Sequence, residues 1–158
     1  MMKNMYIYDT NVGKICIVEN GTEITHLVYK DETIKDEVIV NETPLIKEAK
    51  LQLDDYFNGR RKDFNLPLAP SGTEFQQKVW TALQNIPYGE TRCYSEIAEI
   101  IGDSKASRAV GLANNRNPIS IIIPCHRVIG KSGKLVGYGG GLETKEYLLN
   151  LEKSNTIT

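Results

Sequence analysis

Residues 66–72, with the sequence LPLAPSG, limit most strongly how this chain can fold. Proline fixes φ and lacks a backbone donor, and glycine adds backbone freedom, so this composition disfavours both a helix interior and a central strand. We therefore predict a linker that separates a domain at residues 1–70 from a second domain at residues 71–158. A chain of 158 residues is long enough for two small domains.

The first domain has the sequence pattern of an α/β fold. Its β-prone runs lie at residues 6–8, 14–18, 24–29 and, as a candidate edge strand, 37–40. Asn20-Gly21 is a strong hairpin signal. Thr43-Pro44 is typical of a helix start, and Gly59 of the end of that helix.

The second domain is predicted to be mainly helical and to contain a helix-turn-helix. A capping-box pattern at residues 73–76 begins a helix that reaches about residue 85. A short helix over 94–101 follows, and Asp103 is expected to cap another helix over 104–114. Two helices joined by a glycine-containing turn match the helix-turn-helix outline.

The second helix of that pair has two distinct faces. The expected buried stripe consists of Ala106, Ala109, Val110 and Ala113. Another side carries short or small residues, namely Ser107, Gly111 and Asn114. Arg108 projects from the first turns. Small residues permit close approach of a ligand or tight packing of a helix pair, and the pattern alone leaves both open.

An isoleucine-rich run at residues 119–123 leads into Pro124-Cys125-His126-Arg127-Val128. The run predicts a buried strand or extended segment, which Pro124 ends. A thiol is a strong nucleophile only as the thiolate, and a nearby base or cation lowers its pKa. His126 and Arg127 supply both kinds of neighbour. For the Cys-His pair alone, a buried structural cysteine beside two polar residues is the alternative.

Two later segments could complete a site around this pair. Residues 130–141 are rich in glycine but lack the phosphate-binding loop pattern, so we expect them to line a pocket with backbone groups. In the last helix, Glu152 shares a face with Leu148 and Leu149, which predicts that its carboxylate turns inward. A frayed surface glutamate is the alternative.

Composition excludes several classes of protein. The net charge is −1, the three cysteines are scattered, and there are two histidines. This pattern argues against a disulfide framework and a zinc site, and we expect no metal and no cofactor. No stretch approaches the roughly 18 apolar residues of a membrane span, and no signal-peptide core is evident. We therefore expect a cytoplasmic monomer without a membrane partner.

A local basic region contrasts with this near-neutral total charge. Residues 104–135 contain no Asp or Glu, and their cations are Lys105, Arg108, Arg116, Arg127, Lys131 and Lys134. Such a face suits phosphate contact, although a solvated face without a partner is equally compatible with the run.

Together these segments resemble the O6-alkylguanine-DNA alkyltransferases. The matching stretches lie at residues 88–94, 108–111, 117–118 and 124–152, whereas the first domain matches only as an α/β domain before the active-site domain. The resemblance implies direct-reversal repair, in which an alkyl group passes once from O6-alkylguanine, and from O4-alkylthymine, in double-stranded DNA to Cys125. The protein would then be a stoichiometric, self-inactivating methylated-DNA–protein-cysteine methyltransferase.

The resemblance also implies roles for individual residues around the acceptor thiol of Cys125. His126 would take the thiol proton through a water molecule, and Glu152 would hold the imidazole. Asn117 would brace the helix-turn-helix against the active-site segment. Tyr94 would donate a proton toward the departing guanine.

Further implied roles concern DNA. Arg108 would fill the gap left by a flipped nucleotide. Ser107, Gly111 and Asn114 would let the second helix sit in the minor groove, and Tyr94 would also belong to the DNA-binding residues. The extrahelical base would be recognised at Val128, Tyr138 and Gly139.

Two positions depart from some relatives, since Gly139 stands where a serine occurs and Cys93 where a capping serine is frequent. Three other functions remain as alternatives. They are a non-catalytic alkyltransferase-like lesion binder, a sequence-specific helix-turn-helix regulator, and a cysteine hydrolase with a Cys-His-Glu triad.

Overall fold

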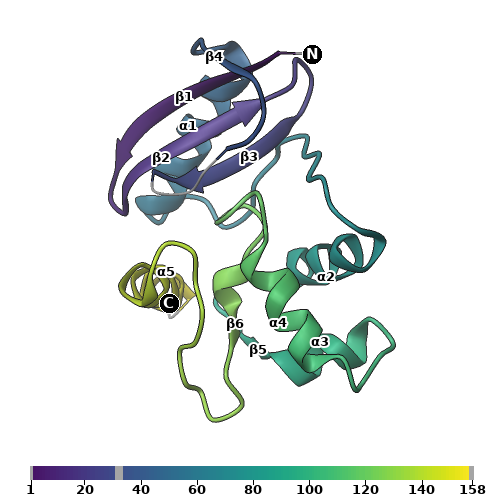
Figure 1. Cartoon of the computed structure of the whole chain (residues 1–158). Helices are drawn as coiled ribbons and strands as arrows, with labels where there is room; N and C mark the ends of the chain where they lie inside the picture. The colour runs from purple at the N-terminus through teal and green to yellow at the C-terminus, as the bar shows by residue number, and fades with distance from the viewer. Residues whose placement is uncertain (1, 31–33, 157–158) are drawn as a thin grey trace. The chain divides into compact units, whose positions relative to one another are not determined.

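The computed structural model describes residues 2–30 and 34–156. The chain divides into two compact units, Met1–Ser71 and Gly72–Thr158 (Figure 1). Each unit has its own secondary structure and its own buried residues, and the two are described separately below.

The first unit is built on a four-stranded sheet with the order β3-β2-β1-β4. The strands are β1 (Lys3–Thr10), β2 (Gly13–Glu19), β3 (Ile24–Tyr29) and β4 (Val38–Val40). The first three are antiparallel neighbours, and β4 pairs with β1 in parallel at the edge. The predicted Asn20-Gly21 hairpin and the predicted edge strand are therefore confirmed. Gly21 has a φ of 105°, which the tight turn requires of it.

Helix α1 (Pro44–Phe57) packs against β1 and β2 of this sheet. The backbone N–H of Ile46 donates to the Thr43 hydroxyl at 3.3 Å, so Thr43 caps the helix as predicted. Gly59, with a φ of 74°, follows the last turn and allows the chain to reverse.

The second unit is mainly helical (Figure 1). Its elements are α2 (Glu74–Gln84), β5 (Arg92–Cys93), α3 (Tyr94–Ile100), α4 (Ser107–Asn115), the 3-10 turn η1 (Cys125–Arg127), β6 (Val128–Ile129) and α5 (Leu142–Thr156). Thr73 and Gln76 form the predicted capping box at the start of α2. Helix α4 packs against α2 and α3, and the Trp80 indole N–H donates to the Ala113 carbonyl at 2.9 Å.

The start of α4 differs from the prediction. The helix begins at Ser107 rather than Ser104, and Asp103 is not its N-cap. Instead the backbone carbonyl of Asp103 accepts from the Ala106 N–H at 3.0 Å, which closes a separate turn before the helix. The buried stripe also differs, because Val110, Ala113 and Asn114 are buried whereas Ala109 is exposed.

The isoleucine-rich run is buried but is not a strand. Residues 119–123 form consecutive tight turns, in which the Ile122 N–H donates to Ser120 O at 2.8 Å and the Ile123 N–H donates to Ile119 O at 3.0 Å. Ile121 has a φ of 71°, a left-handed conformation that is unfavourable for a β-branched residue. Its side chain is nevertheless 1% exposed. The prediction that residues 119–123 are buried is therefore confirmed, whereas the prediction that they form a strand or extended segment is wrong.

Candidate active site

The reactive Cys-His-Arg sequence forms the short 3-10 turn η1 at the end of the buried isoleucine segment. Pro124 directs the chain into this turn, and the Cys125 N–H donates to Ile123 O at 2.8 Å. The Asn117 side chain ties the segment together. Its Nδ2 donates to Ile123 O at 2.7 Å, and its Oδ1 accepts from the Ile119 N–H at 3.0 Å. Asn117 therefore fixes both ends of the strained turn.

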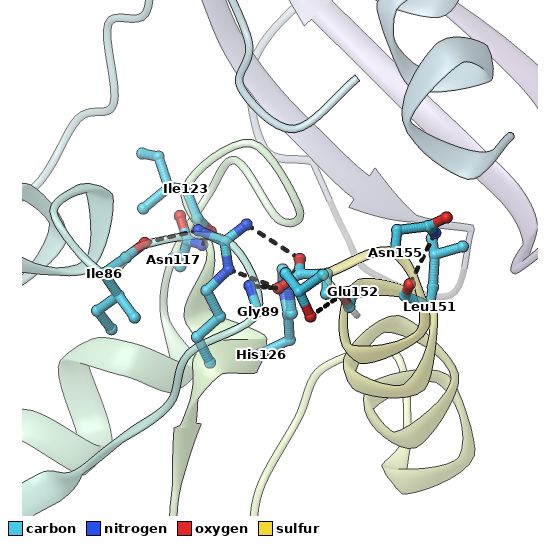
Figure 2. A network of polar contacts seen from close by, with 10 residues as sticks. Ile86, Gly89, Asn117, Ile123, His126, Leu151, Glu152 and Asn155 are labelled. Atoms are coloured by element: carbon cyan, nitrogen blue, oxygen red, sulfur yellow. Dashed lines mark hydrogen bonds and ion pairs between the residues drawn. The ribbon is translucent and has the colours of Figure 1, made fainter. Parts of the chain in front are cut away.

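Glu152 on α5 reaches the same turn through its carboxylate. His126 Nε2 lies 2.7 Å from Glu152 Oε2. Arg127 binds the same carboxylate in a bidentate manner, with Nε donating to Oε1 at 2.8 Å and Nη2 to Oε2 at 3.0 Å. The Gly89 N–H donates to Oε1 at 3.3 Å. Figure 2 shows His126, Gly89 and Glu152 converging in this network.

Burial and charge set the protonation states of this pair. Burial alone would raise the pKa of Glu152, but hydrogen bonds and charge from His126 and Arg127 outweigh it and lower the pKa to about 2. Burial lowers the pKa of His126, and the Glu152 carboxylate opposes that effect. A neutral imidazole that donates from Nε2 to a carboxylate keeps a lone pair on Nδ1. Among the residues that the structure describes, no partner satisfies this buried Nδ1 atom.

The thiol of Cys125 is 4% exposed, and burial raises its pKa to about 11. Hydrogen bonds from Asn117 and Ser120 and the charge of Lys145 act in the opposite direction. The expectation that Arg127 lowers the pKa of the thiol is wrong, because its guanidinium is directed to Glu152 and to the Ile86 carbonyl, 2.7 Å from Nη1. At rest the thiol is therefore protonated, and its activation requires a base.

The residues expected to line the base pocket lie on β6 and on the loop that follows it. Val128 is buried, Tyr138 is half-buried and Gly139 is exposed. Tyr94, the first residue of α3, donates from its hydroxyl to the Val136 carbonyl at 3.2 Å. Burial and the neighbouring Cys125 raise the pKa of Tyr94, so the phenol retains its proton. An ionised Cys125 thiol therefore disfavours ionisation of the Tyr94 phenol.

The residues of α4 that were expected to contact DNA differ in their exposure. Arg108 is exposed, and Ser107 and Gly111 are half-buried. A Cβ atom at Gly111 would lie 3.8 Å from the Tyr94 ring, so this glycine faces α3. Asn114 is 1% exposed and donates from Nδ2 to the Cys125 carbonyl at 3.3 Å. The side chain of Asn114 therefore supports the reactive turn from inside, and the approach of α4 to the minor groove stays a prediction.

Sequence reasoning missed two charged groups at this site. Arg127 was predicted to be a neighbour of the thiol and part of a basic face, whereas it is buried and neutralises Glu152. Lys145 lies in a stretch that matches the family but was given no role, although it is 0% exposed. The spacing along the helix could have indicated that Lys145 is buried. Lys145, Leu148 and Glu152, the buried residues of α5, follow one another at intervals of three and four positions and so lie on one face.

Two classes of feature are missing from the described residues. Residues 2–30 and 34–156 contain no cluster of three or more His, Cys, Asp or Glu side chains that could hold a metal ion. In the same part of the chain, none of the helices combines the length and apolar character that crossing a bilayer requires.

Two family models together span nearly the whole chain. The DNA-binding domain of 6-O-methylguanine DNA methyltransferase matches residues 74–154, and the ribonuclease-like domain of the same family matches residues 5–70. This chain belongs to the 6-O-methylguanine DNA methyltransferase family. The resemblance seen in the sequence is thereby confirmed, and it extends to the first unit, for which the sequence motifs were weaker.

Individual members of the family are similar over almost their full length. A methylated-DNA–protein-cysteine methyltransferase of Methanosarcina acetivorans is 53% identical, with 94% of this chain and 97% of that protein covered. A constitutive enzyme of the same name from Bacillus subtilis is 51% identical, with 92% of each chain covered. The crystal structure of Mycobacterium tuberculosis OGT in complex with DNA superposes with a TM-score of 0.90 at 47% identity, covering 98% of this chain and 94% of that one.

Proposed function

We propose that this protein repairs alkylated DNA by direct reversal, transferring the alkyl group of O6-alkylguanine in duplex DNA to Cys125. The observation that carries the proposal is the buried Cys125-His126 pair joined to Glu152 in a member of the methyltransferase family. The curated relatives are named methylated-DNA–protein-cysteine methyltransferases, and the structural neighbour from M. tuberculosis is a complex with DNA.

The transfer is a nucleophilic displacement at the alkyl carbon. His126 Nδ1 accepts the thiol proton through a bridging water, and the resulting thiolate forms a sulfur–carbon bond while the carbon–O6 bond breaks. Glu152 fixes the tautomer of the imidazole and stabilises the imidazolium that forms. Tyr94 would protonate the departing guanine, which lowers the barrier to its departure. The thioether is stable, so each molecule reacts once.

Access of the lesion to a buried thiol requires that the damaged nucleotide leave the helical stack. We infer that α3 and α4 act as a helix-turn-helix, with the exposed Arg108 occupying the gap in the duplex. Val128, Tyr138 and Gly139 would then contact the extrahelical base. O4-alkylthymine would be a second substrate, because the same displacement can occur at its alkyl carbon. We expect the protein to act as a monomer, with one copy bound at each lesion.

Incubation of the protein with duplex DNA containing O6-methylguanine tests the proposal. We expect the mass of the peptide that contains Cys125 to rise by one methyl group, with one methyl transferred per protein molecule and unmodified guanine restored in the DNA. Tight binding of a lesion that stays chemically intact would instead identify a non-catalytic lesion binder. Repeated turnover on an ester or amide would identify a hydrolase.

A further inference from the structure

Lys145 is a buried cation that the mechanism above leaves without a role. Its residue is 0% exposed, on the inward face of α5 one helical turn before Leu148. Lysine is almost never fully buried unless a partner compensates the cost of removing its charge from water. None of the ion pairs found among residues 2–30 and 34–156 joins Lys145 to a carboxylate. Its compensation must therefore come from other groups.

Backbone carbonyl groups surround the ammonium group. Lys145 Nζ donates to Val128 O at 2.6 Å and to Val136 O at 2.8 Å, and it lies 3.5 Å from Gly137 O. Val128 directly follows the reactive turn η1, and Val136 lies within the glycine-rich residues 130–141. One side chain therefore closes the loop of residues 128–137 by joining its two ends.

The same contacts connect Lys145 to the chemistry. The Val136 carbonyl accepts both from Lys145 and from the Tyr94 hydroxyl, so the two side chains share one acceptor. The positive charge of Lys145 favours the thiolate form of Cys125, and the thiolate in turn favours the charged lysine. Burial lowers the pKa of Lys145 to about 8, so the ammonium form is still in the majority near neutral pH.

We propose that Lys145 is a positioning residue for alkyl transfer, which holds the 128–137 loop and the Val136 carbonyl that binds Tyr94, and whose positive charge favours the thiolate of Cys125. This inference depends on the proposed function, because it assigns Lys145 to the same reaction. It also explains why a charged residue occupies a place where an apolar side chain would cost less to bury.

Two substitutions separate the effect of the hydrogen bonds that Lys145 donates to the loop from the effect of its positive charge. Lys145→Gln keeps an N–H donor for the carbonyl groups but removes the charge, and Lys145→Met removes both. Lys153→Met, on the exposed face of the same helix, is the matched control.

The first measurement is the single-turnover transfer rate at saturating O6-methylguanine duplex. The second is the pH profile for labelling of the Cys125 peptide by iodoacetamide. The groups that face the thiol and influence its titration are Asn117, Ser120, Tyr94 and Lys145.

We expect Lys145→Gln to fold, to bind the duplex as the wild type does, and to transfer the methyl group at least roughly tenfold more slowly. Its Cys125 labelling profile should move to higher pH, which loss of packing alone would not cause. Lys145→Met should be slower still, and Lys153→Met should match the wild type. A folded Lys145→Gln protein with the wild-type rate and labelling profile would overturn the inference. Failure of the wild type to accept a methyl group would instead refute the proposed function.

Discussion

His126 Nε2 and Glu152 Oε2 lie 2.7 Å apart, although 26 positions separate the two residues in the sequence. Both side chains are buried, and Arg127 neutralises the same carboxylate. The pair therefore serves two purposes, because it orients the imidazole for proton transfer and it fastens α5 to the reactive turn.

Replacing Glu152 by Gln should weaken both functions. The change removes the buried charge that pairs with Arg127, and an unpaired buried cation costs about 3 kcal/mol. We expect the free energy of unfolding in urea to fall by that order and methyl transfer to slow. Glu146→Gln, on the exposed face of α5, should leave both quantities unchanged. Equal unfolding free energies for the two variants would contradict the role of the buried pair.

Acid should destabilise the protein through the same residues. The pKa of Glu152 falls from 4.5 to about 2 on folding, so its contribution to stability is complete above pH 4.5 and disappears as the pH falls through 2. The pKa of His126 is lowered below 6.5, so protonation of the unfolded chain also opposes folding below that pH. Urea midpoints should decrease on acidification below pH 6.5, and the decrease below 4.5 should be smaller in Glu152→Gln.

The transfer rate should follow the protonation state of His126. A neutral imidazole is required to accept the thiol proton, and burial keeps the pKa of His126 below 6.5. We therefore expect the single-turnover rate to change little near pH 7 and to fall as the medium is acidified below 6.5. His126→Gln should remove this acid limb. An acid limb of equal size in that variant would assign the titration to another group.

Asn117→Ala should disrupt the reactive turn. The substitution leaves the Ile119 N–H without its side-chain partner, at a cost of about 1 to 3 kcal/mol, and the Ile123 carbonyl keeps the hydrogen bond from the Cys125 N–H. Because the same turn holds Ile121 at a φ of 71°, we expect a loss of transfer as well as stability. Asn150→Ala, at an exposed position of α5, serves as the control in thermal unfolding and transfer assays.

Arg108→Ala should distinguish a contact with duplex DNA from a role in the chemistry. The side chain is exposed on α4, so the variant should fold normally. We expect transfer from duplex DNA to slow by roughly tenfold, because a contact that stabilises the flipped nucleotide is lost. The reaction with a free O6-alkylguanine base should not change. Arg116→Ala, another exposed cation that follows α4, is the comparison. Equal slowing with both substrates would show that Arg108 does not enter the duplex.

Local signals in the sequence predicted much of the fold. Thr43-Pro44, Asn20-Gly21 and the capping box at 73–76 act through nearby backbone groups, so their effect is visible without tertiary information. The inward position of Glu152 also followed from helix spacing. The family motifs named the reactive residues, but not how Arg127 is used.

The failures have a common physical origin in contacts that are distant in sequence. Hydrophobicity predicted that residues 119–123 are buried, but the Asn117 amide determines that they turn rather than extend. Asn114 was grouped with the short residues that permit close approach of a ligand or of another helix, but its side chain bonds the distant Cys125 carbonyl. Lys145 escaped notice because its compensating acceptors are backbone carbonyl groups, which no residue pattern reveals.

Four hydrogen bonds join the Glu152 carboxylate to two other stretches of the chain, at Gly89 and at the reactive turn. A nascent or partly unfolded molecule in which α5 is undocked has neither an oriented imidazole nor the nearby ammonium group. Its thiol would therefore lack the base that accepts the thiol proton. Base-assisted transfer to Cys125 thus depends on the docking of α5 and not on the reactive turn alone.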